Sequence, residues 1–98
     1  MGNTTSISKY HISEYVKYEP GKRYKKYNSD VFWRGEKVHQ ANGVFFIDMN
    51  TGYGKDDKYI FYNGRKIGRL YKHFVSFSNG YAKDDKNKYF RGELLNGK

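Results

Sequence analysis

Aromatic and basic side chains alternate in two short segments of this chain, and together they could bind single-stranded nucleic acid. The two clusters are Lys22, Arg23, Tyr24, Lys25, Lys26 and Tyr27, and Arg65, Arg69, Tyr71 and Lys72. Tyrosine rings stack on unpaired bases, while lysine and arginine neutralise backbone phosphates. Tyrosine and arginine also dominate contact hot spots between proteins. The clusters therefore indicate binding, and an acidic protein surface and nucleic acid are both candidate partners.

Two aspartate pairs, Asp56-Asp57 and Asp84-Asp85, could act as paired acids or ligate a cation. The second pair follows the first by 28 residues, and each is followed by lysine. A catalytic pair is needed once, whereas recurring aspartates are typical of turns, where the carboxylate accepts backbone hydrogen bonds. Calcium needs more oxygen ligands than such turns supply. We therefore expect these aspartates to be structural.

The remaining side chains lack the spacing that catalysis or metal binding requires. The chain has three histidines, His11, His39 and His73, none of them at a metal-ligand spacing from another, and it has no cysteine. It contains no nucleotide-binding glycine loop and no Gly-x-Ser-x-Gly motif. We therefore expect a protein that is not an enzyme and that uses no cofactor and no metal.

A repeat supplies the elements that must position these side chains. The segment 46–64 recurs as 74–92, an offset of 28 residues, and a degenerate first copy begins at Tyr15 and ends at Gly35. Each unit of such a repeat buries its apolar face against its neighbours. We therefore expect a single domain over 1–98, with an N-terminal extension and three tandem units at 1–14, 15–43, 44–72 and 73–98.

Each unit is expected to contain four short antiparallel strands. In the middle unit, Asn63-Gly64 lies between two runs of β-forming residues, and this dipeptide tolerates positive φ at both turn positions. Arg34-Gly35 and Arg91-Gly92 hold the same place in the other units, although arginine suits such a turn less well. The fold class is therefore all-β, a small antiparallel β-meander of three tandem repeats of about 28 residues, sandwich- or barrel-like.

Outside the four-strand pattern, residues 10–18 alternate as in a strand, and residues 39–43 and 68–73 link the units. The second linker could hold a helical turn. Six aromatic residues recur in register, so we expect them to serve the fold: Tyr24, Tyr53 and Tyr81 at one position, and Trp33, Tyr62 and Phe90 at another.

The run Tyr-Ala-Lys-Asp-Asp-Lys-Asn-Lys-Tyr-Phe-Arg-Gly at 81–92 resembles the DKNYY repeat family, which is named for Asp-Lys-Asn-Tyr-Tyr. Residues 53–67 are similar to the same pattern. The resemblance covers 44–98 well and 15–43 poorly, where Asn-Ser-Asp at 28–30 replaces Asp-Asp-Lys, and the doubled aspartate departs from the pattern. It implies a small β-rich repeat domain, in proteins that mostly lack an assigned activity, and implies no catalytic residues.

The formal net charge of +9 favours an acidic partner, although lysines also keep exposed β-edges from aggregating. No apolar run reaches the roughly 18–20 residues that span a bilayer, and the N-terminus lacks an apolar signal region. The absence of cysteine suits a reducing compartment, so we expect a cytoplasmic protein. Gly2 followed by Ser6 fits the loose pattern for N-myristoylation.

These observations predict a non-enzymatic binding module that acts by protein–protein interaction. One use of such a module is a small phage- or virus-encoded inhibitor of a host defence enzyme, which would contact an acidic surface or a nucleic-acid-bound host protein in the host cytoplasm. The alternative is a basic, aromatic-rich protein that binds single-stranded RNA or DNA. The sequence does not choose between the two.

Overall fold

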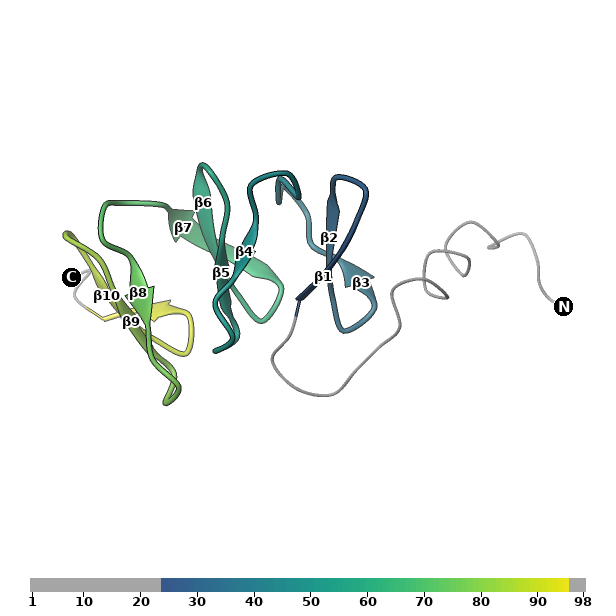
Figure 1. Cartoon of the computed structure of the whole chain (residues 1–98). Helices are drawn as coiled ribbons and strands as arrows, with labels where there is room; N and C mark the ends of the chain where they lie inside the picture. Colours follow the sequence, from purple (N-terminus) through teal and green to yellow (C-terminus); the bar gives the residue numbers. More distant parts are fainter. Residues whose placement is uncertain (1–23, 96–98) are drawn as a thin grey trace, which may run out of the picture.

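The computed structural model describes residues 24–95, which form eleven short β-strands and no helix (Figure 1). The strands are β1 (Tyr24–Tyr27), β2 (Asp30–Trp33), β3 (Glu36–Lys37), β4 (Ile47–Asp48), β5 (Tyr53–Lys55), β6 (Tyr59–Tyr62), β7 (Arg65–Arg69), β8 (Val75–Ser76), β9 (Tyr81–Lys83), β10 (Lys88–Phe90) and β11 (Glu93–Leu94). The predicted all-β class is confirmed.

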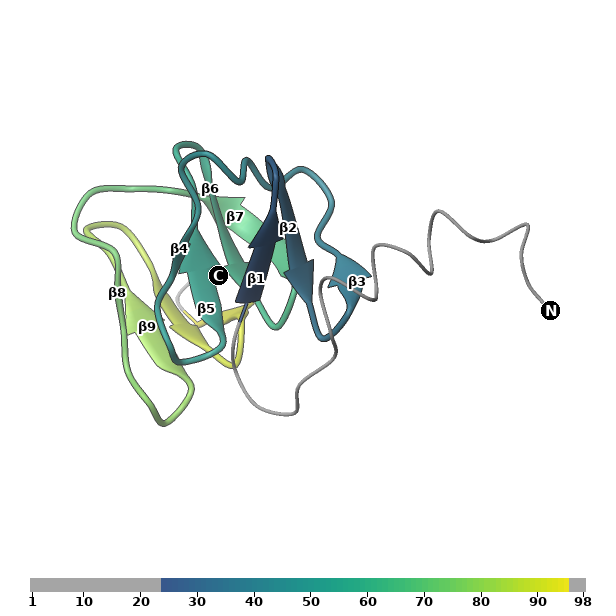
Figure 2. The same cartoon turned by 45° about the vertical axis from the view of Figure 1, so that its right-hand side comes forward.

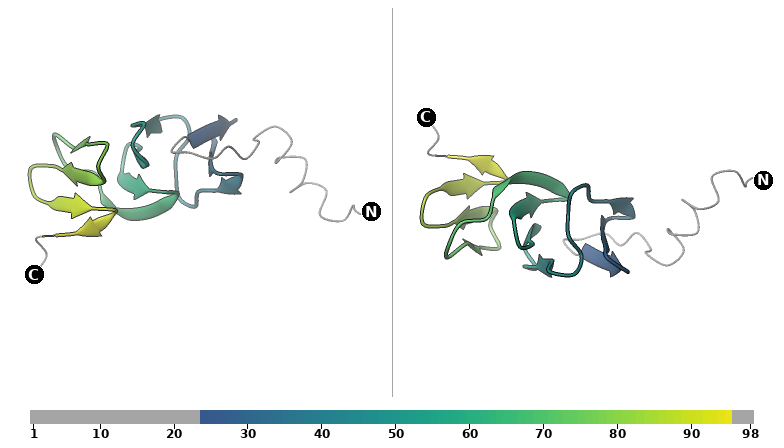
Figure 3. Two further views of the ribbon diagram at one scale, coloured as in Figure 1. Left: turned by 90° about the horizontal axis from the view of Figure 1, so that it is seen from below. Right: turned by 90° about the horizontal axis from the view of Figure 1, so that it is seen from above.

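The strands form three small sheets, and every pair of neighbouring strands is antiparallel. The first sheet has the order β1-β2-β3, the middle sheet β4-β5-β6-β7 and the third sheet β11-β10-β9-β8. The sheets follow one another in chain order along the molecule, so the middle sheet lies between the other two (Figures 1, 2 and 3). All three are open. The sandwich-like arrangement is therefore observed, and a closed barrel is not.

The hydrophobic core lies between the sheets. The first cluster joins the first and middle sheets and contains Tyr24, Val31, Val38, Phe46 and Phe61, and the second joins the middle and third sheets and contains Tyr53, Ile60, Tyr62, Phe74, Ala82 and Tyr89. Successive side chains of a strand point to opposite faces, so β6 contributes Phe61 to the first cluster and Ile60 and Tyr62 to the second. The sheets depend on their neighbours for burial.

The three hairpin turns share one backbone conformation. Asn63 has φ 47° and Gly64 has φ 83°, as a type I′ turn requires. Arg34-Gly35 and Arg91-Gly92 adopt the same conformation, with φ 53° and 86° and φ 51° and 81°. The predicted hairpins are therefore confirmed, and arginine takes the left-handed conformation at two of them.

The aspartate turns also form as expected. Asp56 Oδ1 accepts hydrogen bonds from the backbone N–H groups of Lys58 and Tyr59, both at 2.8 Å. Asp84 Oδ1 accepts the equivalent bonds from Lys86 at 2.8 Å and Asn87 at 2.7 Å. These carboxylates fix the turns that lead into β6 and β10, which confirms their structural role.

The helical turn expected within 68–73 is wrong. Strand β7 continues to Arg69, and a bulge beside Ile60 and Phe61 absorbs one extra residue, so that Gly68 pairs with Ile60. A bulge lets a strand keep its pairing past an unmatched residue. The N-terminal extension 1–14, the strand expected at 10–18 and Gly2 lie outside the described residues.

Candidate binding site at the open end of the third sheet

Tyr24, predicted as a binding residue, is instead part of the core. Its side chain is 7% exposed, and burial raises the pKa of its phenol. The hydroxyl donates to the carbonyl oxygen of Gly52 at 2.8 Å and accepts from the N–H of Gly64 at 3.1 Å. Because ring and hydroxyl are both engaged by the middle sheet, Tyr24 is not available to stack on a base or a partner protein.

The rest of the first predicted cluster does not form one patch. Lys26 Nζ donates to the carbonyl oxygens of Gly43 at 3.0 Å and Phe46 at 3.2 Å, so its charge is held by the backbone that leads into the middle sheet. Lys25 is half-buried and Tyr27 is 36% exposed. Lys22 and Arg23 lie outside the described residues.

The second predicted cluster is divided between two faces of the middle sheet. Arg65 is paired with Tyr62, which belongs to the core cluster shared with the third sheet. Arg69 is paired with Tyr59, which packs against the cluster shared with the first sheet. Tyr71 and Lys72 follow in the loop, where Lys86 Nζ lies 5.1 Å from the Tyr71 ring centroid. These four side chains therefore do not act as one surface.

A different set of residues emerges from three equivalent aromatic pairs. Cross-strand partners Tyr24 and Trp33, Tyr53 and Tyr62, and Tyr81 and Phe90 have ring centroids 4.7, 4.5 and 4.6 Å apart. The Tyr53 hydroxyl donates to the carbonyl oxygen of Gly80 at 2.7 Å and accepts from the N–H of Gly92 at 3.0 Å, as Tyr24 does one sheet earlier. The third pair lies beyond the last sheet-to-sheet contact.

The third pair is the centre of an exposed surface that we call the end face. It consists of Phe77, Tyr81, Lys83, Lys88, Phe90 and Arg91. Tyr81 is 45% exposed and Phe77 is 46% exposed, whereas Tyr53, at the position equivalent to Tyr81, is 0% exposed. Tyr81 is therefore not the core residue that its register predicted.

The end face is aromatic and mainly basic, with three cationic side chains and one exposed carboxylate, Glu93, which lies opposite Phe90. Val31 and Ile60 are fully buried, but the equivalent position of β10 holds the exposed Lys88. Lys88 is directly opposite Lys83, and like charges at such a pair repel. The Arg91 guanidinium lies 5.1 Å from the Phe90 ring centroid. Comparison of the three units position by position reveals this substitution, whereas a search for dense basic runs misses it.

A second exposed apolar group lies at the start of the middle sheet. Val44, Phe45 and Ile47 are 69%, 56% and 53% exposed. The loop is held by the N–H of Gly43, which donates to the carbonyl oxygen of Ser29 at 2.9 Å. Within residues 24–95, the equivalent positions 72, 73 and 75 of the third sheet are exposed too. The structure therefore gives no indication of what would cover this group.

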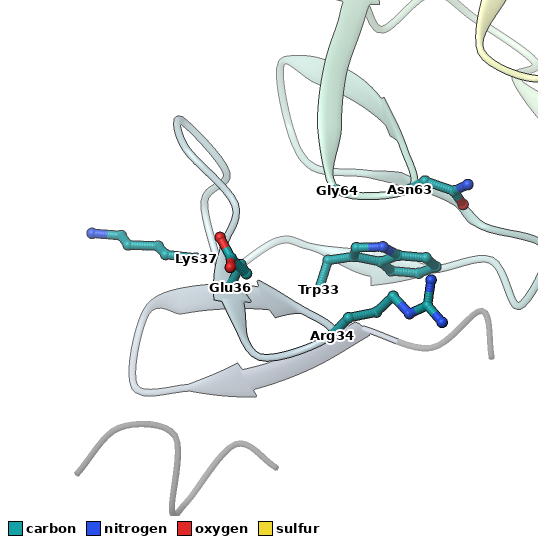
Figure 4. A pocket seen from close by; sticks show the side chains of 6 residues that line it. All are labelled: Trp33, Arg34, Glu36, Lys37, Asn63 and Gly64. Carbon is teal, nitrogen blue, oxygen red and sulfur yellow. The ribbon is translucent and has the colours of Figure 1, made fainter. Parts of the chain in front are cut away.

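A pocket of about 450 Å³ marks the contact between the first and middle sheets (Figure 4). Its walls are Trp33, Arg34, Glu36, Lys37, Asn63 and Gly64. The Trp33 ring lies against the turn at Gly64, and Arg34 extends along the other side of the ring (Figure 4). A Cβ on Gly64 would be 2.8 Å from the Trp33 Cβ, so only glycine fits there.

Residues 24–95 contain no group of three or more histidine, aspartate or glutamate side chains that could hold a metal ion. His73 Nδ1 lies 2.9 Å from an oxygen of Asp85, in an exposed pair. The described part of the chain contains no helix that could cross a membrane. Comparisons with protein-family models, curated proteins and solved structures give no significant match. The DKNYY resemblance therefore remains a prediction.

Proposed function

We propose that this chain is a non-enzymatic binding module that acts by protein–protein contact through the end face. One observation carries the proposal: Tyr53 is fully buried by the following sheet, while Tyr81, in the same position of the last sheet, is 45% exposed. Exposed aromatic side chains among arginine and lysine are typical of contact surfaces between proteins.

The chemistry of the equivalent faces favours polypeptide over nucleic acid as the occupant. Tyr24 and Tyr53 each bond a backbone carbonyl and a backbone N–H of the next sheet. A folded polypeptide can present a backbone carbonyl and a backbone N–H close together, whereas a nucleic acid has no peptide groups. Lys26, which corresponds to Lys83, likewise bonds two backbone carbonyls. The cationic side chains of the end face favour an acidic partner.

Membership of the DKNYY repeat family is a further part of this proposal. A phage- or virus-encoded inhibitor of a host defence enzyme is one form that such a module takes. The net charge of +9 supports such a role, because it favours contact with an acidic surface of the enzyme.

An affinity pull-down from a lysate of the source organism, with and without nuclease, tests the proposal. The baits are the natural chain, an end-face variant with Tyr81→Ala and Lys88→Glu, and a control variant with Phe45→Ala and Lys58→Glu, which changes one exposed aromatic and one exposed lysine elsewhere. We expect one dominant protein that survives nuclease, is lost with the end-face variant and is kept by the control. Recovery that depends on nucleic acid, or equal recovery by both variants, would contradict it.

A further inference from the structure

The two interfaces inside the molecule show what covers a face of this kind. Each time, the tyrosine hydroxyl bonds the carbonyl of one glycine and the N–H of another, and both glycines belong to turns of the next sheet. In residues 24–95 the Tyr81 hydroxyl has no such partner, because no sheet follows β11. The same two backbone groups are therefore the ligands that the Tyr81 hydroxyl is placed to bind.

The glycine turn is also required by shape. A Cβ on Gly64 would lie 2.8 Å from the Trp33 Cβ, and a Cβ on Gly92 would lie 2.8 Å from Tyr62 Cδ2. Both glycines have positive φ, which other L-residues adopt at a cost. Phe90 holds the position of Trp33 and Tyr62 in the third sheet, so a hairpin that covers Phe90 needs glycine at the same point of its turn.

The charge of the end face distinguishes its occupant from another sheet of this chain. Lys88 takes the place of Ile60, directly opposite Lys83. On the first sheet, Lys25 holds the position at which Gly54 and Ala82 face the preceding sheet. A second copy stacked end to end would need the outer face of the first sheet, but there Lys25 is half-buried and its register partner Phe32 is only 3% exposed, so that face is already covered and would add a further lysine beside Lys83 and Lys88. An acidic segment would be attracted instead.

We infer that the end face binds an acidic β-hairpin with a glycine turn on a partner protein, and that this hairpin docks as each sheet of the chain docks on the one before. The inference rests on the proposed function and names the partner's chemistry. The glycine of the turn supplies the N–H for Tyr81 and lies on Phe90, and the acidic side chains of the hairpin lie beside Lys83, Lys88 and Arg91. The carbonyl comes from a second turn of the partner, as it comes from Gly52 and Gly80 inside the chain.

The chain supplies the template for a probe. Residues 59–69 form the hairpin whose turn covers Trp33, and replacing Arg65, Lys66 and Arg69 by glutamate makes it acidic. A disulfide across the ends is needed because an isolated two-stranded hairpin is only marginally stable. Two peptides are matched controls: the same acidic hairpin with Gly64→Ala, and the disulfide-closed hairpin with its natural basic residues.

The experiment is a calorimetric titration of the full chain with each peptide at about 50 mM salt, where charge interactions are weakly screened. The acidic hairpin should bind at least about tenfold more tightly than either control peptide. Lys88→Glu in the protein should weaken binding by about tenfold. Tyr81→Phe should weaken it about fivefold, the value of one neutral hydrogen bond. Lys58→Glu, on an exposed turn of the middle sheet, should leave the affinity unchanged.

Equal affinity for the acidic and basic hairpins, or for the glycine and alanine hairpins, would overturn the inference, as would no binding at all. Tighter binding of a single-stranded oligonucleotide that competes with the hairpin would assign the face to nucleic acid. If the hairpin does not bind, but the pull-down partner is still lost with the end-face variant, only the inference is refuted. Failure of both experiments would refute the proposed function too.

Discussion

The middle and third sheets place the same aromatic pair in opposite environments. Tyr53 and Tyr62 are covered by the third sheet, and the Tyr53 hydroxyl makes two backbone hydrogen bonds. Tyr81 and Phe90 have nearly the same ring separation, but among residues 24–95 no sheet covers them, and Lys88 stands beside them where Ile60 stands in the middle sheet. One pattern of residues is thus buried where a neighbouring sheet follows and exposed in the last described sheet, where we propose that it binds a partner.

Truncation of the two tyrosines should separate these roles most strongly. Tyr53→Ala removes a fully buried ring and should lower the free energy of unfolding by about 3–5 kcal/mol, as for other large aromatic truncations. Tyr81→Ala removes a 45% exposed ring and should cost less than about 1 kcal/mol. Urea denaturation of both variants measures the difference. Similar losses would mean that Tyr81 is also a core residue.

The glycine turn that covers Tyr62 should be the next most sensitive point. Gly92→Ala forces alanine to φ 81° and places its Cβ 2.8 Å from the Tyr62 ring. We expect a loss of about 2–3 kcal/mol, since the left-handed conformation costs about 1–2 kcal/mol and the overlap adds strain.

Gly68→Ala is the matched control, because its φ is not positive and its nearest contact would be an ordinary 3.7 Å from the Tyr89 hydroxyl. That variant should be neutral or more stable by about 0.4–1 kcal/mol. Thermal unfolding of the pair gives the comparison, and a Gly92→Ala protein as stable as Gly68→Ala would show that the turn does not need glycine.

The aspartates of the two turns should differ by a smaller amount. Asp56 uses both oxygens, because Oδ2 also accepts the N–H of Asn42 at 2.9 Å from the preceding linker. Asp84 Oδ2 is buried without a hydrogen-bond partner in the described residues. An asparagine amide can replace only one acceptor oxygen, so Asp56→Asn should cost about 1–2 kcal/mol more than Asp84→Asn. Equal denaturation midpoints would contradict a stabilising role for the hydrogen bond from the N–H of Asn42 to Asp56 Oδ2.

Alkaline pH should weaken the first interface in particular. Burial raises the pKa of Tyr24 above its ordinary value near 10, so its contribution to stability is complete below about pH 10. As the pH rises further, the unfolded chain loses the proton while the folded chain keeps it, and stability falls by about 1 kcal/mol between pH 10 and 11. Tyr24→Phe should flatten this part of the stability curve, and an unchanged slope would contradict the assignment.

Local sequence signals predict most of the fold. Asn63-Gly64 and its arginine-glycine relatives locate the hairpins, and Asp56 and Asp84 locate the turns before them, because each acts on backbone within three residues. The site could not be located in this way. Lys26 is exposed, but its ammonium group bonds carbonyls 17 and 20 residues away, and the bulge in β7 sends Arg65 and Arg69 to different faces.

The burial of a repeated residue depends on whether another sheet packs against its own sheet. Its position within the repeat does not contain that information. Tyr24, Tyr53 and Tyr81 occupy one position of the repeat, yet the first two are buried and the third is exposed. The signal that does exist is the lysine at 88 where valine and isoleucine stand at 31 and 60. An exposed lysine at a position that is apolar in the other two units distinguishes the face of β10 from the faces that a following sheet covers.

The most direct test of the end face is an NMR chemical-shift map of the full chain titrated with the acidic hairpin. We expect the largest changes at the end-face residues, Phe77, Tyr81, Lys83, Lys88, Phe90 and Arg91, while the buried amides of β6 stay unchanged. Shifts centred on Val44, Phe45 and Ile47, or no shifts at millimolar peptide, would contradict it.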